Sequence, residues 1–380
     1  MMRDARALRV LMVDSERSWR GGQGQVLLLM RGLREAGVEV ALAAPADGAL
    51  YGRSAALDVE RHDWRARSSL DLTGLVALRR TIARGGFRVV HSHASRAHGA
   101  VALARAGLNP CPVHVVSRRV DFPPGRGPAS RWKYRRGADA YIAISIGVRD
   151  VLVAAGIEPA RVFVAPSGID LGRFAGVRDP AYLRAEFDLG DGERVVGNVA
   201  ALAPHKSQSD FVRAAARLRA SGRNVRFFIV GEGELRASLE SLARDLGLGD
   251  AVVFTGFRAD AMELIRLFDV FVMSSYLEGL GTSIMDAQAL GVPVVATRTG
   301  GIPEIVEDGV SGLLVPPRDP EALAGAIARM LDDAPLREAC ARTARERSGG
   351  YDYRRMVYKT LDVYRRLCDV DHPLGRNKTA

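Results

Sequence analysis

Cysteine is scarce in this sequence, which holds three cysteines in 380 residues. An odd number of widely spaced cysteines supports neither a disulfide framework nor a zinc knuckle. We therefore expect Cys111, Cys340 and Cys368 to be plain thiols.

Long apolar runs are absent as well. No run approaches the roughly 20 residues that a transmembrane helix needs, and the apolar segment within residues 1–16 is too short for a signal peptide. We expect a cytoplasmic protein. With 47% hydrophobic and 26% charged residues, the composition is typical of a globular protein. The length exceeds the usual size of one hydrophobic core, which predicts two domains.

Acidic residues are few in the first half of the chain. Residues 1–168 hold 26 Lys and Arg against 14 Asp and Glu, whereas the remainder holds 28 against 30. This asymmetry is typical of a half that meets an anionic surface or substrate. An arginine-rich coding bias would produce the same imbalance, and the composition leaves both explanations open.

Short β-branched runs alternate with amphipathic stretches along both halves. This alternation indicates parallel sheets covered on both faces, and the two series predict two doubly wound α/β domains. We expect a first domain over residues 1–168, a second over 169–350, and a terminal helix over 351–370 that packs back towards the first domain. The expected strands lie at residues 8–13, 38–44, 87–91, 112–116, 140–144, 194–200, 225–230, 251–255, 269–273 and 292–297, and a further strand is expected at the end of the stretch 292–315.

The stretch EGLGTSIMD, residues 278–286, follows an expected strand and opens a helical pattern. Ligands of parallel sheets bind outside the carboxyl ends of strands, so we expect Glu278 at a ligand site. Asp286 has two interpretations, because it is either a second ligand group or, with Ser283, a capping box for the helix.

The glycines between the two acids would let the backbone approach a ligand closely, and free amides at the helix start would favour an anion there. The residues expected to line the ligand in this way are Gly279, Leu280, Gly281, Thr282 and Ser283.

This stretch continues as GVPVVATRTGGIPEIVEDGVSGLLVPPRDP, and the combined pattern resembles the signature of the retaining glycosyltransferases of family 4, glycosyl transferases group 1. The resemblance covers nearly the whole chain and implies the GT-B fold, in which two Rossmann-like domains face each other across a cleft. It implies that the first domain binds the acceptor and the second the nucleotide sugar. Glu278 would contact hydroxyls of the donor sugar, and Asp286, where the family usually has Glu, would contact the ribose.

Other stretches match further landmarks of the family. WRGGQGQVLLL resembles its N-terminal glycine loop, which places Gly21 and Gly22 near the sugar-donor phosphates and the acceptor. A dinucleotide fingerprint does not fit there, because Leu27 stands where the third glycine belongs. VFTGFR resembles the turn that faces the nucleobase, so Phe257 and Arg258 are candidates for base contact; an ordinary strand-end turn is the alternative.

The stretch VAALAPHKSQSD, residues 199–210, departs from the family pattern. Lys206 matches a lysine that faces the diphosphate, and the resemblance gives it a catalytic role beside Glu278. Ala201 occupies the position of the family's arginine, so one positive charge is missing. We hypothesise that His205, Arg298 or an arginine of the first domain supplies it.

Histidines gather after the expected strand at 87–91. His91 and His93 form an H-x-H pair, but no carboxylate or cysteine completes a metal site. We therefore expect no metal, and the resemblance implies no cofactor beyond the nucleotide-sugar substrate. Arg118 and Arg119 stand where many family members have a histidine near the donor sugar. That catalytic role is either unfilled or belongs to His93, for which a structural role at the strand end is the alternative.

Basic and aromatic residues interleave over residues 118–136. This pattern suits an anionic membrane surface, a lipid-linked phosphate or single-stranded nucleic acid, and a solvated helix is the alternative. We favour a lipid acceptor or a membrane, with the protein peripheral on its cytoplasmic face. The residues assigned to the acceptor or membrane are Arg118, Arg119, Arg131, Trp132 and Lys133.

These features together predict a retaining, metal-independent hexosyltransferase. It would move a sugar from a UDP- or GDP-sugar to a hydroxyl of a glycan or lipid-linked acceptor, in bacterial cell-envelope glycan synthesis. Two alternatives stay open: a sugar-nucleotide epimerase or hydrolase on the same fold, and a non-enzymatic nucleic-acid-binding protein.

Overall fold

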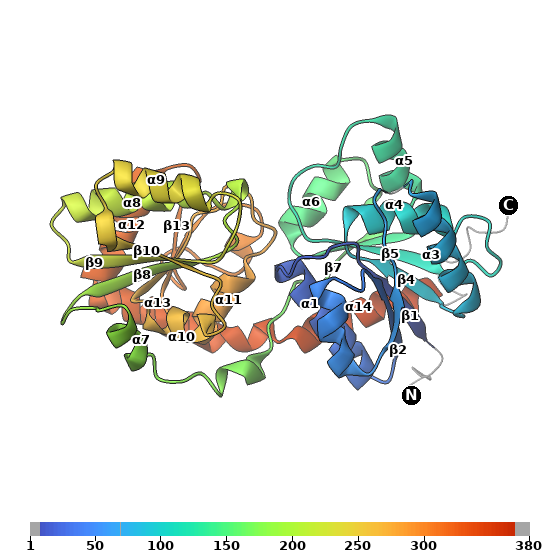
Figure 1. The fold of residues 1–380 in the computed structure, drawn as a ribbon, viewed down its shortest axis with the longest axis horizontal. Helices are drawn as coiled ribbons and strands as arrows, with labels where there is room; N and C mark the ends of the chain where they lie inside the picture. The colour runs from blue at the N-terminus through green and yellow to red at the C-terminus, as the bar shows by residue number, and fades with distance from the viewer. Residues whose placement is uncertain (1–7, 69, 369–380) are drawn as a thin grey trace. The chain divides into compact units, whose positions relative to one another are not determined.

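The computed structural model describes residues 8–68 and 70–368. Backbone contacts divide the chain into two compact units (Figure 1). The first unit contains the chain up to Gly168 and, in addition, the helix that begins at Tyr353. The second unit contains residues 169–352.

The first unit is built on a parallel sheet with the strand order β3-β2-β1-β4-β5-β6-β7. The strands are β1 (Arg9–Val13), β2 (Glu39–Ala44), β3 (Glu60–Asp63), β4 (Val89–Ser92), β5 (Val113–Arg118), β6 (Ala140–Ala143) and β7 (Val162–Val164). The helices are α1 (Gly21–Glu35), α2 (Ala49–Arg53), α3 (Leu72–Arg84), α4 (Ser95–Ala104), α5 (Pro128–Arg136), α6 (Ile146–Ala154) and α14 (Tyr353–Cys368), with 3₁₀ turns η2 (Ser54–Leu57) and η3 (Pro159–Arg161).

Helices cover both faces of this sheet, because successive strand residues point to opposite sides. Val10 and Met12 of β1 pack with α1 and α14, whereas Leu11 and Val13 pack with α3 and α4. The chain winds outward in both directions from the neighbouring strands β1 and β4. Such a switch point is where open α/β sheets bind ligands, beyond the carboxyl ends of the strands.

The second unit has the same architecture, with the parallel strand order β10-β9-β8-β11-β12-β13 and its switch point between β8 and β11. The strands are β8 (Arg194–Val199), β9 (Val225–Val230), β10 (Val252–Gly256), β11 (Val270–Met273), β12 (Val294–Thr297) and β13 (Leu313–Val315). The helices are α7 (Ala181–Glu186), α8 (Gln208–Ala220), α9 (Arg236–Asp245), α10 (Ala261–Leu267), α11 (Thr282–Ala289), α12 (Pro320–Asp332) and α13 (Ala334–Arg347). The 3₁₀ turns are η4 (Leu171–Phe174), η5 (Pro204–Lys206), η6 (Gly249–Ala251), η7 (Ile302–Glu304) and η8 (Ser348–Tyr351). The prediction of two parallel α/β sheets is confirmed.

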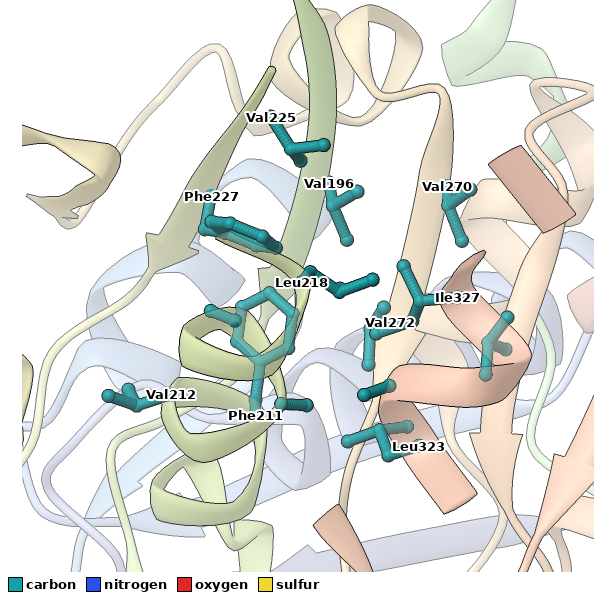
Figure 2. Close-up of a cluster of buried hydrophobic side chains, with 14 of the residues drawn as sticks. Val196, Phe211, Val212, Leu218, Val225, Phe227, Val270, Val272, Leu323 and Ile327 are labelled. Atoms are coloured by element: carbon teal, nitrogen blue, oxygen red, sulfur yellow. The ribbon is translucent and has the colours of Figure 1, made fainter. Parts of the chain in front are cut away.

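The core of the second unit packs α8 and α12 onto one face of the sheet (Figure 2). The rings of Phe211 in α8 and Phe227 in β9 meet edge-on, with centroids 6.0 Å apart. Leu323 and Ile327 of α12 fill the same cluster. Each such side chain stabilises the fold by about 1.5–3 kcal/mol when fully buried.

The terminal helix α14 packs on α1 in the first unit. It spans Tyr353–Cys368, so residues 351 and 352 of the expected helix precede it, and residues 369–370 lie outside the described part of the chain. Gly32 allows the close approach, because a Cβ at this position would lie 2.5 Å from the Val357 side chain. The Tyr353 hydroxyl donates a hydrogen bond to Glu35 Oε2 at 2.9 Å.

Candidate functional site

Three loops of the second unit meet at the carboxyl ends of its strands. Hydrogen bonds tie them together. The Ser274 hydroxyl donates to the Lys206 carbonyl at 2.9 Å, and the Gly301 amide donates to the Glu278 carbonyl at 3.1 Å. The loops after β8, β11 and β12 therefore form one surface at the switch point of the sheet.

Glu278 and Lys206 form an ion pair at the centre of this surface. The Ser275 hydroxyl lies 3.2 Å from Glu278 Oε2, close enough to donate a hydrogen bond. The exposed fractions of the side chains are 17% for Lys206 and 12% for Glu278, so water screens the pair only partly. The structure thus brings together two residues that are 72 positions apart in the sequence.

The glycine loop leads directly into α11. Gly281 has a φ of 90° and is the N-cap of this helix, a conformation that favours glycine. The first amides of a helix have no partner within it, so those of Thr282 and Ser283 can face an anion. Leu280, in contrast, is buried and packs into the unit, so its side chain serves the loop rather than the surface.

Asp286 is the fifth residue of α11, one turn further along than an N-terminal capping residue. The helix has no side-chain cap hydrogen bond, so the capping box with Ser283 is not formed. The buried carboxylate of Asp286 instead forms an ion pair with Arg173 of η4. Burial raises the pKa of Asp286, and the attraction of Arg173 opposes that rise.

Phe257 and Arg258 lie in the turn after β10, where the first is exposed and the second is held by ion pairs. The Phe257 side chain is 64% exposed. Arg258 is held by two carboxylates: Nε lies 2.8 Å from Asp260 Oδ1, and Nη1 lies 2.5 Å from Glu186 Oε1. Hydrogen bonds to these partners raise the pKa of Arg258, and Arg258 lowers the pKa of Asp260 to about 2. The guanidinium of Arg258 thus ties α7 to the turn.

His205, Arg298 and Arg318 follow β8, β12 and β13 at the same edge of the sheet as Ala201, the position where the sequence lacks the family's arginine. His205 belongs to η5, and the amide of Tyr276 donates to its carbonyl at 3.0 Å. Arg298 is paired with Asp308 at 2.6 Å. Arg318, which sequence reasoning did not single out, stacks over the Tyr276 ring at 4.2 Å. Its signal was its place just after β13, at the same edge of the sheet as the other loops.

The glycines at the start of α1 lie beside a buried acid in the first unit. Asp14, directly after β1, accepts a hydrogen bond from Gln23 Nε2 at 3.2 Å, and burial raises its pKa. Gly21 is the first residue of α1, and a Cβ on Gly22 would lie 3.7 Å from Arg119 Cδ. The expected glycine loop and Arg119 are therefore neighbours.

His91 in β4 and His93 directly after it are buried. His91 Nδ1 lies 2.5 Å from the Tyr364 hydroxyl and Nε2 lies 2.9 Å from Ser117 Oγ. Burial lowers the pKa of His91 and His93 well below 6.5, so both are neutral at pH 7. Among the described residues, no group of three potential ligands is arranged to hold a metal ion.

The residues expected to contact an acceptor or membrane separate into two sets. Arg118, Arg119 and Lys133 line a cavity of about 330 Å³ together with His93. Arg131 and Trp132 are exposed on α5. In the part of the chain that the structure describes, no helix is both long and apolar enough to cross a membrane.

Comparisons with known proteins give two family matches and many relatives. The family described as Glycosyltransferase Family 4 matches residues 19–173, and Glycosyl transferases group 1 matches residues 182–347. The chain is 33% identical over 304 residues to a D-inositol 3-phosphate glycosyltransferase of Acidothermus cellulolyticus, covering 74% of this chain and 67% of that protein. It is 36% identical over 219 residues to a GDP-mannose-dependent alpha-(1-6)-phosphatidylinositol monomannoside mannosyltransferase of Mycolicibacterium smegmatis, covering 54% and 57%.

Solved structures share the fold across both units. The Anabaena protein HepE, solved with UDP and glucose, superposes with a TM-score of 0.82 at 22% identity, covering 94% of this chain and 99% of that one. The chain spans about half of the length of several other curated relatives that it matches.

Proposed function

The chain belongs to family 4 of the glycosyltransferases and has the GT-B fold, and we propose that it transfers a sugar from a nucleotide sugar to an acceptor hydroxyl. The donor is a UDP- or GDP-linked hexose. The acceptor is a glycan or a lipid-linked molecule. The anomeric configuration is retained and no metal ion takes part.

The observation that carries this proposal is the ion pair of Lys206 and Glu278 at the switch point of the second unit. Both residues were expected to meet a nucleotide sugar, and separate loops bring them together. An ammonium beside a helix start suits a diphosphate, because both stabilise negative charge. A carboxylate suits the sugar, because it accepts hydrogen bonds from hydroxyls.

In the proposed reaction, the C1–O bond to the diphosphate breaks and a bond from C1 to the acceptor oxygen forms on the same face. Lys206 and the first amides of α11 stabilise the charge that grows on the leaving diphosphate. Glu278 orients the sugar, and Asp286 contacts the ribose after exchanging part of its interaction with Arg173. A phosphate oxygen of the leaving group takes the proton of the acceptor. Catalysis then rests on positioning and electrostatics.

The names of relatives support the choice of donors. The mycobacterial relative is GDP-mannose-dependent, and HepE was solved with UDP. The exposed Arg131 and Trp132 of α5 support a peripheral contact with an anionic membrane surface, where bacterial envelope glycans are assembled.

A thermal-shift screen of UDP-, GDP- and ADP-sugars tests the donor, since binding to the folded state raises the melting temperature. Incubation of the stabilising nucleotide sugar with candidate acceptors, followed by NMR of the product, reads the anomeric configuration. The same reaction in EDTA tests the metal independence. Release of free sugar at the same rate with and without every acceptor would contradict transfer and favour a hydrolase.

A further inference from the structure

We propose that the cavity of the first unit binds a phosphate group carried by the acceptor. This inference rests on the proposed function, because it specifies the acceptor of that reaction. The cavity has a volume of about 330 Å³ and lies among residues after β4, residues after β5, and α5. The side chains on which the inference depends are His93, Ser95, Arg118, Arg119 and Lys133.

The two arginines reach the cavity without a salt bridge among the described residues. Arg118 donates to the Tyr134 hydroxyl at 2.9 Å and to the Phe122 carbonyl at 2.5 Å, both neutral acceptors. The Nε and Nη1 atoms of Arg119 are buried and have no hydrogen-bond partner within residues 8–68 and 70–368. Asp14 attracts Arg119 only at longer range. Two guanidinium groups thus keep donors available for a ligand.

Lys133 adds a third cation from α5. Its ammonium donates to Ser95 Oγ at 3.0 Å, which is again a neutral partner. Burial lowers the pKa of Arg118, Arg119 and Lys133, to about 10 for Arg119, which therefore stays protonated at pH 7. Asp121 and Asp14 attract Arg118 and Arg119 without forming a salt bridge to them in the described part of the chain. Burial of such cations destabilises a fold, and a bound anion would reduce that cost.

Two further groups favour a ligand at this place. His93 is 9% exposed and lines the cavity, and its Nδ1 has no hydrogen-bond partner in the described part of the chain. Ser95 begins α4, a ten-residue helix without a side-chain cap hydrogen bond, so its first amides also favour an anion. Glu16, an acidic residue that also lines the cavity, forms an ion pair with Arg96 at 3.4 Å.

The arrangement suits phosphate better than a single carboxylate. Arg118 at the end of β5, Arg119 directly after it and Lys133 of α5 bring three cations to the cavity from two segments of the chain. A phosphate offers oxygen atoms in more than one plane. The volume leaves room for the sugar or lipid group to which the phosphate is attached.

Isothermal titration calorimetry of the full chain with inorganic phosphate at constant ionic strength tests this inference. We expect Arg119→Gln to weaken phosphate binding about tenfold or more, because a charge-assisted hydrogen bond is lost. Lys206→Ala, in the second unit, should leave this binding intact. Arg126→Gln removes an equal charge from an exposed position outside the cavity and should also bind phosphate like the wild type.

Phosphate binding that survives Arg119→Gln but not Lys206→Ala would overturn the inference, as would a wild-type protein that binds no phosphate. If Arg119→Gln does not fold, Lys133→Gln gives the same test, because the hydrogen bonds of its ammonium within the described residues go to Ser95. Tighter binding of glucose 6-phosphate than of glucose would indicate that a soluble sugar phosphate carries the phosphate group. Tighter binding to vesicles with phosphatidic acid than to pure phosphatidylcholine vesicles would indicate that a lipid carries it. Glucuronate bound as tightly as glucose 6-phosphate would refute the assignment to phosphate.

UDP titrations separate this inference from the proposed function. We expect UDP to bind Arg119→Gln as it binds the wild type, so loss of the phosphate site alone leaves the transfer reaction standing. Loss of UDP binding in Arg119→Gln would assign this arginine to the sugar donor and overturn the inference. A wild type that binds phosphate at the cavity but no sugar nucleotide would instead overturn the proposed function.

Discussion

The candidate sites of the two units hold their positive charges in opposite ways. In the second unit Lys206 is paired with Glu278, and Arg173 with Asp286. In the first unit Arg119 and its neighbours line a cavity without a salt bridge among the described residues. Under the proposed function, a nucleotide sugar at the second unit would replace parts of these ion pairs with its own hydroxyls and charges. An anionic ligand at the cavity of the first unit would bring the negative charge itself, so we expect the two sites to select ligands of different chemistry.

The largest expected effect breaks the central pair of the second unit. Glu278→Ala leaves Lys206 without its partner and the sugar without an acceptor for its hydroxyls. We expect turnover to fall at least about 100-fold, the scale of losing one strong transition-state contact. Steady-state kinetics with the identified nucleotide sugar measures the loss. Glu321→Ala, at an exposed pair with Arg217, is the matched control and should turn over normally. Equal rates in the two variants would contradict the role of Glu278.

The pH dependence of stability should differ between the units. Burial lowers the pKa of His91, His93 and His98 well below 6.5, all in the first unit. The unfolded chain binds protons at these histidines near pH 6.5 whereas the fold does not. The stabilisation is therefore present above pH 6.5 and is lost as pH falls. Each histidine contributes a slope of up to about 1.4 kcal/mol per pH unit.

Hydrogen exchange between about pH 7 and pH 5, corrected for intrinsic rates, measures this difference unit by unit. Protection of β1 and β4 should fall faster than that of β8 and β11, because the second unit contains a single histidine, His205. In His91→Gln the slope of the first unit should decrease. The same slope in both units of the wild type would contradict the prediction.

A smaller effect is expected for the second ion pair. Asp286→Asn keeps the shape of the side chain and removes its charge. If Asp286 contacts the ribose, nucleotide-sugar affinity should fall about tenfold. The melting temperature should change little, because burial already disfavours this carboxylate. Calorimetric titration and thermal unfolding read the two quantities. A lower melting temperature with normal affinity would make Asp286 only a structural partner of Arg173.

The smallest expected effect concerns the exposed cations of α5. Arg131→Gln should weaken binding to anionic vesicles about fivefold, since one basic residue near such a surface contributes about 1 kcal/mol. Co-sedimentation with phosphatidylserine vesicles measures it. Arg217→Gln removes an exposed charge from the second unit and should bind the vesicles normally. An equal loss in both variants would point to net charge rather than to a membrane-facing helix.

The buried strands could be predicted from the sequence, because a strand covered on both faces is a continuous apolar run. The strands β3 and β7 could not. β3 reads ERHD, is largely exposed at the edge of its sheet, and shows no apolar pattern. β7 has only three residues, too few for a pattern. Both are defined by pairing with a neighbour that only the folded chain supplies.

Some residues of the candidate site could likewise be predicted from the sequence, and others could not. Glu278 and Lys206 could be predicted because both follow strands, and parallel strands share one edge. Arg173 could not, because its pairing with Asp286 joins positions 113 apart and depends on the path of the chain after Gly168. Arg258 was predicted as a base contact, and nothing in its local sequence indicated that Glu186 of α7 would hold it.

The position of α14 has a consequence for how the chain acquires its structure during synthesis. Tyr353, Val357 and Tyr364 belong to the core of the first unit, yet they leave the ribosome after all of the second unit. The second unit is contiguous and can complete its core earlier. Until α14 is synthesised, the surface of α1 around Gly32 stays uncovered. The nascent first unit therefore exposes apolar core surface for longer than the second unit does, although it is translated first.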